Sequence, residues 1–215
     1  FDFAGDVGAG MDFLQRHERI APDKIGLIGH SEGGVIAPLV ARERNDVAFA
    51  VLLAGTGVRG DKLLVMQNAA IMRASDIDEE TISAACSAQE RLFAIVLDSA
   101  LSPQELETRL TRVIQVEEEF QKASAEDQAQ GLKTALAQLT NPWMVTFIRH
   151  DPAAVLRKVR CPVLALNGEL DLQVPFKANL DGIAIALEAA ENPDFTTRAF
   201  PGLNHLYQHC ETGLI

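Results

Sequence analysis

The sequence predicts an α/β fold built on a parallel β-sheet, with an all-helical insertion between two parts of the sheet-forming core. Three apolar runs, at 24–28, 47–53 and 161–168, have the length of strands, and continuous apolarity is typical of strands that are buried on both faces. Each run is followed by a helical pattern. This alternation of strand and helix is typical of a parallel sheet, in which helices connect successive strands.

The first part of the core is expected at 1–56. Residues 2–17 predict a helix, because Val7 and Met11 recur at helical spacing. The first apolar run then leads through a glycine-rich turn into a second helix, which is expected to reach about Arg44. The second apolar run completes this part of the core.

The stretch at 57–150 predicts helices alone. Its helical patterns cover 62–74, 78–98, 102–123 and 125–139, and a short one starts at Asn141. Ser102 and Glu105 form a capping box with Pro103 at the first helical position, and Gly131 is expected to interrupt the fourth pattern. Two interpretations stay open for this insertion, a packing module or a cap over an active site.

The second part of the core is expected at 151–215. A short helix at 153–159 precedes the third apolar run, and a further helix is expected at 179–191. Residues 195–200 predict a fourth strand. The Pro-Gly-Leu-Asn-His turn that follows places His205 just past the end of this strand.

The composition argues against several classes of partner. The 215 residues include 19 basic and 30 acidic side chains, for a formal net charge of −11, which disfavours nucleic acid and anionic membrane surfaces. No apolar run approaches the ~18 residues of a membrane span. Cys86, Cys161 and Cys210 are odd in number and far apart, so no disulfide framework is predicted. No cofactor is predicted.

The turn after the first strand reads Gly29-His30-Ser31-Glu32-Gly33, which matches the G-x-S-x-G nucleophile elbow. In this motif the serine lies in a strained conformation at the tip, and the flanking glycines leave room for the neighbouring strand and helix. The start of the following helix favours developing negative charge. The alternative is an ordinary glycine-rich turn. The strand before the motif and the helix after it favour the nucleophile elbow.

Three residue types that acyl transfer requires follow three different strands. Ser31 follows the first strand, Asp171 the third and His205 the fourth, and in a parallel sheet these loops leave the same carboxyl edge. The order Ser, Asp, His is the order expected with a nucleophile elbow. His205 is therefore expected to be the base and Asp171 to orient it, with the N–H of Glu32 as an oxyanion donor. Glu169, two residues before Asp171, is the alternative candidate for the orienting carboxylate.

The other candidate residues have weaker signals. His30 precedes the nucleophile and is expected to line the pocket. Trp143 and Phe147 lie on the short helix of the insertion, and if the insertion is a cap they are expected to contribute to an apolar acyl or alcohol pocket. Each is also typical of ordinary packing. His205 and His209 are four residues apart, but no carboxylate spacing supports a metal site, and none is predicted.

The motifs at 24–34, 162–175 and 200–206 resemble those of the α/β-hydrolase superfamily, and within it the bacterial serine esterases with a helical cap. The resemblance implies that Ser31, Asp171 and His205 form a catalytic triad. It also implies an eight-stranded fold, of which this chain supplies strands five to eight. The loop after strand three, which carries the other oxyanion N–H in this family, is then missing.

This incomplete pattern leads to an expectation about partners. The chain begins at Phe1 rather than at a methionine and stops at Ile215 without a closing helix, so it is expected to be a piece of a longer protein. The absence of a signal-peptide pattern therefore leaves its compartment, cytoplasmic or periplasmic, open. The first of its strands would have an unpaired edge, which invites pairing with another chain. A homodimer or a separate N-terminal segment is expected to complete the sheet.

The function expected from these residues is a serine carboxylesterase that cleaves esters of small to medium acyl chains through an acyl-enzyme. The same triad serves amidases, peptidases and thioesterases, so these stay open as alternatives. A truncated hydrolase fragment that folds or binds without turnover is a further alternative.

Overall fold

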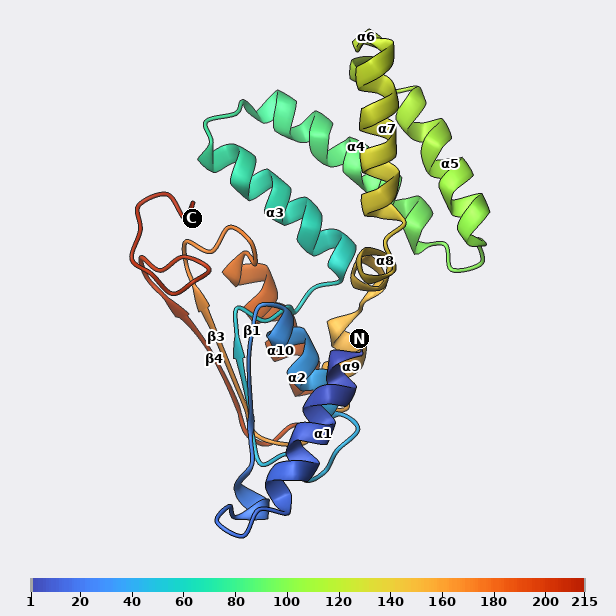
Figure 1. The fold of residues 1–215 in the computed structure, drawn as a ribbon. Coiled ribbons are helices and arrows are strands. Elements are labelled where there is room, and N and C mark those ends of the chain that lie inside the picture. The colour runs from blue at the N-terminus through green and yellow to red at the C-terminus, as the bar shows by residue number, and fades with distance from the viewer. Residues whose placement is uncertain (1, 215) are drawn as a thin grey trace. The chain divides into compact units, whose positions relative to one another are not determined.

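The computed structural model describes residues 2–214, and it contains a four-stranded parallel sheet (Figure 1). The strands are β1 (Leu27–His30), β2 (Ala50–Leu53), β3 (Val163–Gly168) and β4 (Phe195–Phe200), and this is also their order across the sheet. Every neighbouring pair is parallel. The predicted fold class is therefore confirmed, and the sheet joins the two sequence segments that flank the long helical stretch.

The strands are shorter than the apolar runs that predicted them. β1 begins at Leu27 rather than at residue 24, and β2 begins at Ala50 rather than at residue 47. The early residues of both runs are apolar for another reason, since Ile25 and Val47 are buried in the core ahead of the hydrogen-bond ladder. β1 instead extends through Gly29 and His30, directly up to Ser31.

Helices cover one face of this sheet (Figure 1). The helices of this part are α1 (Phe3–Gln15), α2 (Glu32–Ala41), α9 (Pro152–Leu156) and α10 (Phe176–Ala189), and the 3₁₀ turn η1 (Pro22–Lys24) precedes β1. α2 packs on β1 and β2, α10 packs on β3 and β4, and α1 packs on α2. The core between these layers consists of buried aliphatic side chains, among them Met11, Val40, Leu52, Ile183 and Leu187.

The other face of the sheet is exposed, which corrects the expectation of strands buried on both faces. Successive side chains of a strand point to opposite faces, so Leu27 and Gly29 face the helices while Ile28 faces away. Ile28 is 69% exposed, and Phe49 and Leu164 are 41% and 37% exposed. Within residues 2–214 no strand pairs with the free edge of β1.

The described residues of 57–150 form helices joined by turns and loops, with no strand among them, as predicted. This stretch contains α3 (Gly60–Ala74), α4 (Glu79–Leu97), α5 (Pro103–Gln115), α6 (Glu118–Lys122), α7 (Ala125–Leu139) and α8 (Pro142–Arg149). The capping box of Ser102 and Glu105 is confirmed. Two details were wrong: α7 is continuous through Gly131, and the helix predicted at 102–123 is divided, because α5 ends at Gln115 and Glu117 is the N-cap of α6.

The chain forms two compact units. One consists of Phe1–Ile77 and Asp151–Ile215, which includes the sheet and α3, and the other is Asp78–His150. In the second unit α4 packs against α5 and α8, and α7 packs against α5 and α8. The domain division at 1–56, 57–150 and 151–215 stays a prediction. Within the described residues every helix is too short or too polar to cross a membrane.

Candidate active site

Ser31 lies in a strained turn between β1 and α2. Its φ and ψ are 54° and −114°, in a region that side-chain-bearing residues seldom occupy and that is found mainly where surrounding structure enforces it. Gly29 makes this turn possible, because a Cβ there would collide with the carbonyl of Gly33. This backbone is the geometry that a nucleophile elbow requires.

The expected role of Gly33 needs a correction. A Cβ at Gly33 would meet no atom within 4 Å, so a side chain there would not clash. The close approach occurs one residue later, where a Cβ on Gly34 would lie 2.7 Å from the Cα of Gly55. The missing side chain at Gly34 therefore lets α2 pack against the loop that follows β2.

Asp171 lies in the loop after β3, and its carboxylate is buried. One oxygen, Oδ1, accepts hydrogen bonds from the backbone N–H groups of Gln173 at 2.9 Å and Val174 at 2.8 Å. Asn167, also buried, donates from Nδ2 to the Val174 carbonyl at 2.9 Å and closes the same loop. Two hydrogen bonds therefore hold the Asp171 carboxylate itself, and a third holds the loop around it. The competing carboxylate of Glu169 is exposed.

The second oxygen of Asp171 is bonded to His205. The distance from His205 Nδ1 to Asp171 Oδ2 is 2.9 Å, and both side chains are buried. A carboxylate oxygen accepts a hydrogen bond, so Nδ1 of His205 carries the proton. In the neutral ring Nε2 is then unprotonated and can accept a proton, which is the tautomer that a general base requires.

A tight turn after β4 presents His205. The backbone N–H of Asn204 donates to the Gln208 carbonyl, and the Asn204 side-chain oxygen accepts from the N–H groups of Leu206 and Gln208, each at 3.0 Å. Leu203 and His209 form an antiparallel bridge at the base of this turn. A Cβ on Gly168 would collide with the Leu203 carbonyl, so glycine there lets the turn approach the loop of Asp171.

The structure brings His205 next to the Ser31 turn through His30. His30 Nε2 donates to the His205 carbonyl at 2.8 Å, and the two imidazole rings are 4.8 Å apart between centroids. Since His30 immediately precedes Ser31, the expected nucleophile, base and orienting carboxylate meet at one edge of the sheet. No hydrogen bond joins Ser31 Oγ to His205 among the described residues. Such contacts are often long without substrate and tighten in the complex.

The remaining predicted residues are placed as follows. Glu32 is the first residue of α2, so its backbone N–H lies in the first helical turn, beside Ser31. Trp143 and Phe147 lie on α8, in the other compact unit, with their rings stacked at 5.2 Å between centroids. Their role as pocket residues stays a prediction. Within residues 2–214 no cluster of three or more His, Cys, Asp or Glu side chains is arranged to hold a metal ion.

Sequence reasoning missed Tyr207. Its hydroxyl donates to the Leu166 carbonyl at 2.7 Å and accepts from the Ala54 N–H at 3.0 Å, so it joins the His205 turn to the ends of β3 and β2. Burial raises the pKa of the Tyr207 phenol to about 12. The sequence signal was its position two residues after His205, but nothing local indicates that its side chain reaches two other strands.

Comparisons with known proteins give one family match and several similar solved structures. A family model described as BAAT / acyl-CoA thioester hydrolase C terminal matches residues 8–123, which is more than half of the chain. The matched range includes Ser31 but ends before Asp171 and His205. A comparison with curated proteins gave no match.

Several solved structures are similar to the chain at low sequence identity. They include a proline iminopeptidase from Mycobacterium smegmatis, with 16% identity and a TM-score of 0.48, covering 97% of this chain and 64% of that one. An α/β fold family hydrolase from Bacillus anthracis has 19% identity and a TM-score of 0.47, covering 92% of this chain and 64% of that one. A third is the esterase RhEst1 from Rhodococcus, with 18% identity and a TM-score of 0.43, covering 94% of this chain and 64% of that one. The chain spans less than two thirds of the length of each.

Proposed function

The chain belongs to the BAAT / acyl-CoA thioester hydrolase C-terminal family within the α/β-hydrolase superfamily, and on this basis we propose that it is a serine hydrolase that cleaves carboxylic esters of small to medium acyl chains. The observation that carries the proposal is the buried hydrogen bond of 2.9 Å between Asp171 and His205 beside the Ser31 turn. This arrangement supports a nucleophile, a base and an orienting carboxylate.

In the proposed reaction His205 Nε2 takes the proton of Ser31 as Oγ attacks the ester carbonyl carbon. The resulting oxyanion is stabilised by donors that include the N–H of Glu32, and loss of one such donor typically costs about 10²–10³ in rate. The intermediate then collapses, the C–O bond to the alcohol breaks, and His205 returns the proton to the departing alcohol. Water, deprotonated by His205, attacks the acyl carbon of the acyl-enzyme. The bond from this carbon to Ser31 Oγ then breaks, and His205 returns the proton to Oγ as the acid is released.

A thioesterase is the second candidate, because the matching family is described by acyl-CoA thioester hydrolysis. The net charge of −11 favours the ester over this alternative, since a strongly acidic protein repels polyanionic coenzyme A unless a basic patch receives it. The chemistry at Ser31 is the same for both substrates. The leaving group therefore has to be tested directly.

The test is hydrolysis of p-nitrophenyl esters from acetate to decanoate, compared with the acyl-CoA thioesters of the same acids. We expect measurable kcat/KM on the esters, with an optimum at short or medium chains and at least about 10-fold preference over the matching thioester, because the acidic surface opposes the anionic leaving group. Preference for thioesters would replace the esterase with a thioesterase. No turnover of either series by a folded sample would contradict the proposal for this chain.

The bare side of the sheet leads to a proposal about partners. The free edge of β1 offers N–H and C=O groups that no described strand pairs with, and Ile28 of β1 and Leu164 of β3 are exposed on the face of the sheet opposite the helices. Parallel sheets are normally covered on both faces, and exposed edges pair with other chains. We propose that a second copy of this chain, or a separate N-terminal segment, adds to the edge of β1 and covers this face.

The mass of the chain in solution, measured by light scattering, tests this proposal. We expect a dimer or higher association for the isolated chain, and Ile28→Lys should shift it toward monomer because a charge would then lie at the centre of the interface. Ile185→Lys, at an exposed site on α10, is the matched control and should leave the mass unchanged. A stably folded, strictly monomeric chain would contradict the proposal.

A further inference from the structure

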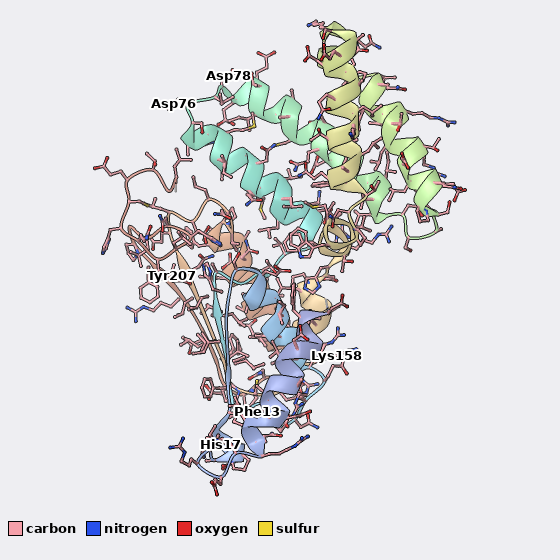
Figure 2. All side chains as sticks on the ribbon, viewed as in Figure 1. Phe13, His17, Asp76, Asp78, Lys158 and Tyr207 are labelled. Carbon is pink, nitrogen blue, oxygen red and sulfur yellow. The ribbon has the colours of Figure 1, made fainter. Side chains whose placement is uncertain are left out.

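Tyr207 connects three elements of the candidate active site. It lies in the turn that presents His205, beyond the end of β4 (Figure 2). Its hydroxyl uses both hydrogen-bonding modes, donating to the Leu166 carbonyl of β3 and accepting from the Ala54 N–H just after β2. A phenol whose pKa is raised to about 12 stays protonated at neutral pH, so this donor is always present there.

The peptide group between Leu53 and Ala54 extends the connection to Ser31. Its N–H donates to the Tyr207 hydroxyl at 3.0 Å, and its carbonyl accepts the backbone N–H of Ser31 at 2.9 Å. One rigid, planar group is therefore hydrogen-bonded on one side to the nucleophile turn and on the other side to the base turn. A movement of Tyr207 would change the position of His205 relative to Ser31.

The backbone on both sides of this connection is strained. Tyr207 has a φ of 59° and Ala54 a φ of 50°, although neither is glycine. Conformations of this kind persist only where surrounding contacts enforce them, and they cluster at functional sites. The same N–H of Ala54 also lies 2.9 Å from the Leu166 carbonyl, so Tyr207, Ala54 and Leu166 form a closed set of hydrogen bonds.

We propose that Tyr207 is a positioning residue, whose hydroxyl fixes the distance between the His205 ring and Ser31 through the Leu53–Ala54 peptide. His30 makes a second contact to the same turn, at the His205 carbonyl. The Asp171 contact orients the imidazole ring but does not fix the turn that carries it. This proposal rests on the serine hydrolase function proposed above, because only proton transfer between Ser31 and His205 requires the distance to be fixed.

Tyr207→Phe tests the proposal, since phenylalanine keeps the ring and removes only the hydroxyl. We expect kcat on a p-nitrophenyl ester to fall about 10- to 100-fold, because misplacement by about 1 Å can cost 10²-fold. KM should change by no more than about 2-fold, because Tyr207 is not proposed to touch the substrate. All rates are expressed per folded molecule, with folding checked by circular dichroism and thermal melting.

Asn192→Ala is the control for a purely structural effect. Asn192 is buried and donates to the carbonyls of Val159 and Cys161, before β3, at the opposite end of the strands from Ser31. The Asn192→Ala variant should lower the melting temperature by at least as much as Tyr207→Phe does. The kcat of its folded molecules should stay unchanged. Equal losses of kcat in both variants would show that Tyr207 acts only through stability and would overturn the proposal.

A second readout does not depend on turnover. The Nδ1–H proton of His205, bonded to buried Asp171, should give a downfield NMR signal that is assigned by its absence in His205→Gln. In Tyr207→Phe we expect this signal to broaden or to shift because the turn is less fixed. An unchanged signal together with unchanged kcat overturns the positioning role. If the wild-type chain does not hydrolyse esters, the esterase proposal fails, and the signal alone decides the role of Tyr207.

Discussion

Ser31→Ala should lower ester hydrolysis by at least about 10⁴-fold, to the level of background, because no other group can form the acyl-enzyme. The substitution removes one oxygen. It leaves the close approach of Gly29 to the Gly33 carbonyl and the N-terminus of α2 unchanged. Folding should therefore be preserved. The measurement is kcat/KM on the best p-nitrophenyl ester, with the melting temperature of each variant recorded alongside.

Ser75→Ala is the matched control for this result. The Ser75 hydroxyl donates to the Ile71 carbonyl at the end of α3 and has no place in the proposed chemistry. It should retain activity within about 2-fold. Residual turnover above background in Ser31→Ala, in protein free of contaminating esterase, would contradict the assignment of the nucleophile.

Asp171→Asn should lower kcat by up to about 10⁴-fold through the wrong histidine tautomer. Oδ1 of Asp171 accepts two backbone N–H groups, so an asparagine would keep its oxygen there and present its NH₂ group to His205. Nδ1 of His205 would then have to accept a hydrogen bond, and Nε2 would carry the proton. A protonated Nε2 in the neutral ring cannot take the proton of Ser31.

Glu169→Gln separates this account from the alternative that the sequence left open. Glu169 lies in the same loop but is exposed, so its neutralisation should leave kcat within about 2-fold. Steady-state kinetics of both variants on one ester make the comparison. Near-normal activity in Asp171→Asn with a large loss in Glu169→Gln would reverse the assignment.

The positions of Ser31, Asp171 and His205 at strand ends could be predicted from sequence, because each follows a segment with a strong strand signal. The carboxyl edge of a parallel sheet then brings such loops together regardless of their separation in the chain. The choice between Asp171 and Glu169 could not be made with equal certainty, since both lie in one loop and only burial and hydrogen bonding distinguish them.

The contacts of Tyr207 and Asn204 could not be predicted, because they depend on the three-dimensional path of the turn after β4. Tyr207 reaches β2 and β3, which are distant in sequence, and no local pattern reports such a contact. The break between α5 and α6 was missed for a different reason. No glycine or proline marks it, and the apolar periodicity continues across it.

Labelling with a fluorophosphonate tests the central claim most directly, because the reagent reacts with a serine that a neighbouring base activates. The result does not depend on which leaving group the enzyme's substrate carries. Intact-mass spectrometry should show one adduct per folded chain, located on Ser31 by peptide mapping, and none in Ser31→Ala or His205→Ala. A folded wild-type chain that takes up no reagent, or takes it up equally in His205→Ala, would contradict the account of a serine activated by His205.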